Sequence, residues 1–291
     1  MKNSKIITVL VLLMIIFSGI ATVMGITSND GPGEYDYMSI RGENITIYGK
    51  GLYRHMSADV AIQGIAQDYI TLFLGIPLLL FALFIFRKNN VRGLFLLSGT
   101  LMYFLVTYLF YTAMAMYNVM FLVYLALLCF SFFAFVMSLF FYNIPEIKQM
   151  FSSEKLIRYS GLFLVINSVM VAMLWLSIII PPLLDGSIYA KDLQHYTTLI
   201  VQGFDLGLLL PIGIVSGLLA FRKNRYGYLF TTINLIFLSI LMAALTSKIL
   251  FMANAGENVI PVIFIMPTVC LISTVLSLFI LKKIKVNVKK I

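Results

Sequence analysis

Residues 69–92, YITLFLGIPLLLFALFIFRKNNVR, decide the fold. An apolar run at 69–86 is followed at once by a basic turn that contains Arg87, Lys88 and Arg92. A helix needs roughly 20 mainly apolar residues to cross the hydrocarbon core of a bilayer, and Lys and Arg are retained on the cytoplasmic side. The stretch therefore predicts a transmembrane helix that ends in the cytoplasm.

Seven further apolar runs of this kind occur in the 291-residue chain. Hydrophobic residues make up 61% of it and charged residues 11%, whereas soluble domains carry roughly 25% charged residues. The sequence predicts an all-α fold, a polytopic membrane helix bundle of about eight transmembrane helices. We expect them at about 6–25, 69–86, 93–113, 118–141, 157–180, 198–221, 227–252 and 259–281.

The basic residues orient these helices. With the N-terminus inside, 16 of the 21 Lys and Arg residues fall on the cytoplasmic side, together with only Glu146 and Glu154 among the acids. This asymmetry predicts a multi-pass protein of the cell membrane with both termini in the cytoplasm. The net charge of +9 follows from the same placement, and nothing resembles a basic module for nucleic acid.

The remaining segments divide the chain. We expect an external loop at 26–68, with a short strand at 45–48, helices two to four at 69–141, a cytoplasmic linker at 142–156 and helices five to eight at 157–281. The basic tail at 282–291 should lean on anionic headgroups at the cytoplasmic face, at ~1 kcal/mol per Lys. Residues 1–25 have two interpretations, a first transmembrane helix or a cleaved secretory signal.

The two halves of the chain resemble each other. The run Phe86-Arg87-Lys88-Asn89 recurs as Phe221-Arg222-Lys223-Asn224, 135 positions later, and Gln67 and Gln202 share that offset. Four helices per unit is an even number, so both copies enter the membrane from the same side. The sequence predicts two parallel four-helix repeats about an axis along the membrane normal, and this pattern favours retention of the first helix.

Three ionisable residues fall inside the apolar runs, where their cost makes each a candidate functional residue. Counting ~1.5 Å per residue, Asp205 lies ~26 Å, Asp68 ~28 Å and Lys248 ~32 Å from the cytoplasmic end of its helix. All three therefore lie near the outer edge of a core ~30 Å thick. Lys248 is placed to serve as counter-ion to either aspartate.

Polar neighbours suggest an outward-facing cavity around these charges. The candidate ligand-binding residues are Asp205, Asp68, Lys248, Gln202, Gln67, Tyr103, Tyr108 and Tyr111. An alternative is that the small residues of this region, Gly203/Gly207 and Gly213/Gly217, form helix–helix seams, while Lys248 extends to the headgroups.

No cofactor or metal is expected. His55 and His195 lie in external loops, and Cys129 and Cys270 lie inside apolar runs, without the spacing of a metal or redox site. The sequence contains no hydrolase, metalloprotease, nucleotide-binding or dinucleotide motif, which favours a protein that is not an enzyme.

The run from Asp205 to Pro211, followed by residues 221–228, resembles a pattern in prokaryotic multi-pass membrane proteins for which no activity is known. Residues 51–54 and Gln67-Asp68 are similar to the first-half counterpart of that pattern. The resemblance covers most of the chain from residue 48 and implies no activity or site residues.

Three functions remain open. The first is a carrier or binding protein for a small solute or lipid, with a polar site near the outer leaflet. The second is a non-catalytic scaffold, sensor or assembly factor that uses the 26–68 loop as its contact surface. The third is an intramembrane lipid-modifying enzyme, for which Asp205 is the deepest acid.

The predicted topology can be measured with reporter fusions. Fusions after Ile291 and near Asn90 should be active in the cytoplasm, while a fusion near Asp185 should not. An external C-terminus would contradict both the orientation and the parallel repeat.

Overall fold

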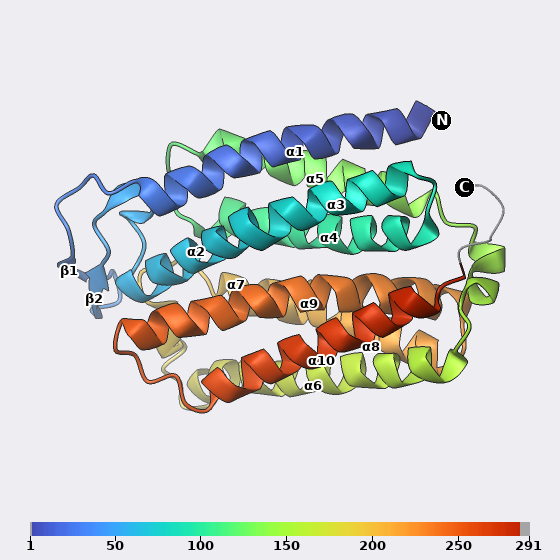
Figure 1. Ribbon diagram of the computed structural model, residues 1–291. Helices are drawn as coiled ribbons and strands as arrows, with labels where there is room; N and C mark the ends of the chain where they lie inside the picture. Colours follow the sequence, from blue (N-terminus) through green and yellow to red (C-terminus); the bar gives the residue numbers. More distant parts are fainter. Residues whose placement is uncertain (1, 286–291) are drawn as a thin grey trace.

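The computed structural model describes residues 2–285 as a bundle of helices that run along one common direction (Figure 1). Eight spans are long and apolar enough to cross a membrane, which supports the predicted multi-pass membrane protein. The elements are α1 (Lys2–Thr27), β1 (Tyr35–Met38), β2 (Asn44–Ile47), α2 (Ala58–Ile70), α3 (Ile76–Arg87), α4 (Val91–Met114), α5 (Phe121–Leu139), α6 (Glu154–Leu184), α7 (Ile200–Phe204), α8 (Leu210–Phe221), α9 (Arg225–Asn254) and α10 (Val262–Lys283).

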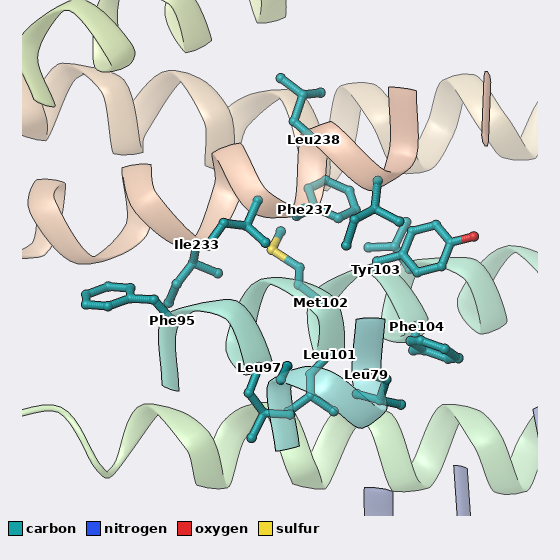
Figure 2. Close-up of a cluster of buried hydrophobic side chains, with 14 of the residues drawn as sticks. Leu79, Phe95, Leu97, Leu101, Met102, Tyr103, Phe104, Ile233, Phe237 and Leu238 are labelled. Atoms are coloured by element: carbon teal, nitrogen blue, oxygen red, sulfur yellow. The ribbon is translucent and has the colours of Figure 1, made fainter. Parts of the chain in front are cut away.

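The helices α4 and α9 form the centre of the bundle. Each packs against the other and against the helices that precede and follow it in the chain. Met102 of α4 lies beside Ile233 and Phe237 of α9, while Leu97 and Leu101 point from the opposite face of α4 (Figure 2). This pair joins the first half of the chain, α1 to α5, to the second half, α6 to α10.

Gly99 allows α4 and α9 to approach closely. A Cβ atom at this position would lie 2.5 Å from the Cβ atom of Ile236 and 3.1 Å from the carbonyl oxygen of Ile233. Helices in a membrane associate through close packing, for which small residues at the crossing are required. The contact between the halves therefore depends on the missing side chain.

The first helix is built into the bundle. It packs against α2, α3 and α5, and Ile7, Val11 and Met14 are completely buried.

The second and sixth spans are broken in the same way. Residues Thr71–Gly75, between α2 and α3, and Asp205–Leu209, between α7 and α8, each form one π turn. A π turn interrupts the regular hydrogen bonding of an α-helix and is common at functional sites. Pro77 and Pro211 are each the second residue of the helix that follows, where the missing N–H of proline is tolerated.

The turns after these spans also match. Asn89 and Lys223 have positive φ angles of 56° and 54°, and Asn90 and Asn224 cap the next helix through their side chains. These pairs lie 134 positions apart, one position out of step with the sequence match. Asn89 and Asn90 are adjacent, so either one can be aligned with Asn224 in the sequence. Because Asn90 and Asn224 are the residues that cap the next helix, Asn90 is the structural equivalent of Asn224.

At one end of the bundle, β1 and β2 form an antiparallel hairpin, with Met38 opposite Asn44. The second strand lies one residue before the expected strand at 45–48. We call this the hairpin end. The helix α1 begins and α10 ends at the opposite end (Figure 1), which we call the terminal end.

The loop between α6 and α7 packs onto the hairpin end. The Arg41 guanidinium donates hydrogen bonds of 3.0 Å to the carbonyl oxygens of Gln194 and Tyr196, and the Ser57 N–H donates to the Tyr196 hydroxyl. Burial raises the pKa of Tyr196, so its hydroxyl stays protonated. These bonds join loop segments of the two halves at the hairpin end.

At the terminal end, the last described residues are held by the linker after α5 and by α4. Arg92 donates to the carbonyl oxygens of Lys282 and Ile284, and Phe151 forms an isolated β-bridge with Ile284. Of the basic tail expected at 282–291, residues 286–291 lie outside the described residues.

Substitution of Gly99 by Ala should lower the thermal stability of the purified protein, because overpacking of a tight contact costs typically 1–3 kcal/mol. The matched control is Gly19→Ala in α1, where no atom lies within 4 Å of the added Cβ atom; it should be neutral or slightly stabilising. Equal stability of the two variants would contradict the close approach of α4 and α9.

Candidate functional site

A cavity of about 150 Å³ lies between the two halves at the hairpin end. It is well above the about 10–15 Å³ that one water needs. Its walls come from α2, α4, α7, α9 and the π turn at 205–209. Four of the expected site residues line it, namely Gln67, Tyr111, Asp205 and Lys248. Thr107, which accepts a hydrogen bond from Gln67, lines it as well.

Asp205 is the first residue of its π turn and is half-buried. Its carboxylate accepts a hydrogen bond of 2.8 Å from the indole N–H of Trp175 on α6. Sequence reasoning missed Trp175, although it is the only tryptophan of the chain and its N–H needs an acceptor when it is removed from water. A carboxylate can accept several hydrogen bonds, so Asp205 retains capacity for a ligand.

Lys248 lines the same cavity from α9. The expected ion pair with an aspartate is not formed: within residues 2–285, the ion pairs are Arg54–Asp30 and Lys223–Glu154. The two carboxylates accept hydrogen bonds from tyrosine and tryptophan donors in place of the lysine. The ammonium group of Lys248 is thus left facing the cavity without an acidic partner in the described part of the chain.

Asp68 is more deeply buried than Asp205, with 3% of its surface exposed. The hydroxyl groups of Tyr53 and Tyr111 donate hydrogen bonds of 2.5 Å and 2.8 Å to its two oxygens. Burial, and then the charge of Asp68, raise the pKa of Tyr53 well above its usual range, so Tyr53 remains a donor. Both tyrosines line the cavity, and Asp68 lies behind them.

Glycines make room for this cluster. A Cβ atom at Gly25 of α1 would overlap the Asp68 carboxylate, and one at Gly64 would lie 3.3 Å from the Tyr53 ring. Gly25 therefore has a packing role, in addition to its place near the end of the possible signal sequence.

Gln67 and Tyr103 form a second buried group beside Asp68. The Gln67 amide donates a hydrogen bond of 2.8 Å to the Tyr103 hydroxyl. The same hydroxyl also forms a hydrogen bond of 2.8 Å with the Thr71 hydroxyl in the π turn. Gln67 lines the cavity, whereas Tyr103 lies outside its wall.

Two further expected residues lie away from the cavity wall. Gln202 is buried on α7, and Tyr108 is buried on α4 against Tyr111 and Tyr124. The hydroxyls of Tyr108 and Tyr124 have no hydrogen-bond partner among the described residues. Gln202 and Asp205 are only three residues apart in the sequence, but Asp205 alone of the two lines the cavity.

The alternative interpretation as helix seams fits one pair of small residues. Gly217 and Gly161 bring α8 and α6 into backbone contact, and Gly213 lies against Ser168. Gly203 and Gly207 have nothing within 4 Å of an added Cβ atom. This helix–helix contact therefore lies farther from the hairpin end than Asp205, and Asp205 takes no part in it.

His195 Nε2 contacts the backbone oxygen of His55 at 3.0 Å, and the described residues hold no group of three or more potential ligands.

Comparisons with models of protein families, with curated proteins and with solved structures found no match for this chain. The site is therefore interpreted from its own geometry.

Substitution of Tyr111 by Phe should destabilise the purified protein by about 1.5–3 kcal/mol, because the buried Asp68 carboxylate loses one of its two donors. Tyr117→Phe is the matched control, since Tyr117 is 80% exposed. If both variants melted at the same temperature, the bond to Asp68 would not contribute to stability.

Proposed function

We propose that this chain is a membrane carrier or binding protein for a small polar or amphiphilic molecule, which it takes up in the cavity between its halves. The observation that carries the proposal is Lys248, a cation that faces this cavity and has no acidic partner among the described residues. A charge within a membrane span is expensive unless it is paired. A bound anionic group would supply that partner.

The opposite charge of Asp205 further restricts the chemical class of ligand that would fit the cavity. Its carboxylate is held by one donor, Trp175, and can accept a second from the ligand. A molecule that carries an anionic group and a hydroxyl or ammonium donor would match both residues. The cavity volume of about 150 Å³ suits a small head group of this kind.

We also propose the orientation and the repeat that the sequence predicts. The basic turns at Arg87 and Arg222 lie at the terminal end, where α1 begins and α10 ends (Figure 1), which supports a cytoplasmic location for that end. The π turns and asparagine caps that recur 134 positions apart support two parallel repeats. The burial of α1 supports its retention in the mature protein.

A second candidate function is a scaffold or sensor, with the external segment as its contact surface. The observation in its favour is an exposed apolar edge on the hairpin, where Met38 is 70% and Ile40 is 90% exposed. The enzyme hypothesis has less support, because the partner of the Asp205 carboxylate is an indole, which is not an acid or a base.

The function can be tested by the thermal stability of the purified protein during titration with phosphoethanolamine and with inorganic phosphate. A compound that binds the folded state stabilises it by about 2.7 kcal/mol at a concentration of 100 Kd. We expect stabilisation of the wild type that Lys248→Met abolishes and Asp205→Asn weakens.

The control variant is Lys155→Met, which removes an exposed lysine without an ion pair among the described residues and should respond like the wild type. If Lys248→Met also responded like the wild type, the cavity would not be the binding site. A scaffold would instead tolerate Lys248→Met and lose its activity when Met38 and Ile40 are replaced by Ser.

A further inference from the structure

An apolar groove lies next to the cavity that holds Lys248 and Asp205. The groove has a volume of about 520 Å³ and lies between α4 and α5 of the first half and the start of α8 in the second half. Val106 of α4 and Leu209 of the π turn belong to the walls of both spaces. On the other side of the junction, α2 packs directly against α9.

The groove is lined by aliphatic and aromatic side chains together with the sulfur-containing side chains of Met102 and Cys129. The groove is open to the surroundings, since Leu125, Phe132 and Ile212 are 39%, 47% and 39% exposed. Along α5 it extends from Leu125 to Phe135, ~15 Å at the rise of an α-helix. This is half of a hydrocarbon core ~30 Å thick, the depth of one leaflet.

The cavity and the groove lie at successive depths along the bundle. On α4, which runs toward the hairpin end, the groove is lined between Met102 and Leu109 and the cavity between Val106 and Met114. On the opposite wall, Asp205 precedes Leu208 and Ile212 in a segment that runs away from the hairpin end. Charged groups therefore lie at the hairpin end, and the apolar groove lies deeper, as the head and chain of a lipid do in one leaflet.

We propose that the ligand is an amphiphile with a single hydrocarbon chain, whose head group binds Lys248 and Asp205 and whose chain lies in this groove. The inference rests on the proposed function of the cavity and names its substrate class. Lys248 takes an anionic group of the head, and Asp205 takes a hydrogen-bond donor of the head. Bilayer lipid covers any exposed helix, but this groove differs because it shares the wall residues Val106 and Leu209 with the cavity that holds Lys248 and Asp205.

The test uses the full chain in phosphatidylcholine vesicles that contain a lysophosphatidylethanolamine with a photoactivatable group near the end of its chain. Its phosphate suits Lys248 and its ammonium group suits Asp205. After illumination, we expect labelled peptides from residues 102–109 and 125–135, and an excess of the unlabelled lipid should remove this labelling.

Two variants test separately the binding of the head group and the binding of the hydrocarbon chain. Lys248→Met should weaken the labelling of the groove about tenfold, because it removes a charge-assisted contact. Leu125→Trp should block the groove to a similar extent, while the matched Leu271→Trp on the exposed face of α10 should leave the labelling unchanged. Stabilisation by phosphoethanolamine, retained in Leu125→Trp, would show that this variant is folded.

The outcomes distinguish the two proposals. Labelling spread evenly over exposed faces such as α6 and α10, or groove labelling that Lys248→Met leaves unchanged, would overturn the amphiphile proposal. If phosphoethanolamine still stabilised the wild type and not Lys248→Met, the function of the cavity would stand. If neither the head group nor the lipid bound, both proposals would fail.

Discussion

The carboxyl group of Asp68 must be satisfied inside the protein, because a polar group without hydrogen-bond partners in an apolar interior is too costly to keep. Tyr53 and Tyr111 supply the two donors, and Gly25 lets α1 approach the carboxylate. One buried group thus ties together α1, the turn before α2, α2 itself and α4. The tyrosine rings that satisfy Asp68 also form one wall of the cavity, so the shape of the site depends on this interaction.

The two halves share local structure but differ in their polar residues. Thr71 and Asp205 each begin a π turn, and Thr71 binds Tyr103, whereas Asp205 faces the cavity. Met114 and Lys248, 134 positions apart like the π turns, both line the cavity. The polar side chains of the first half therefore bind one another, while the charged side chains of the second half remain available to a ligand.

Much of the helical architecture could be predicted from the sequence, because the length of an apolar run and the basic residues after it are local properties. Asp205 and Lys248 were found by the same reasoning, since both are ionisable residues within apolar runs. Their contacts were not found. The expected ion pair neglected Trp175, which lies on another helix, and no spacing along the chain indicates that contact.

The buried network around Asp68 could not be predicted from the sequence either. The turn that carries Tyr53 lies 15 residues before Asp68 and folds back over it, and Gly25 comes from the first span. Gln202 lies three residues before Asp205, about one helical turn away, yet it does not share the cavity wall with Asp205. Features that depend on contacts between distant segments, or on one inserted residue, require the three-dimensional structure.

The most direct measurement is a high-resolution cryo-electron microscopy map of the full chain in lipid nanodiscs that contain phosphatidylethanolamine and its lyso form. The account predicts continuous density from Lys248 and Asp205, past Val106 and Leu209, into the groove between α4 and α5. A closed cavity, in which the Lys248 ammonium group lies within 4 Å of the Asp205 carboxylate and no density separates them, would contradict it.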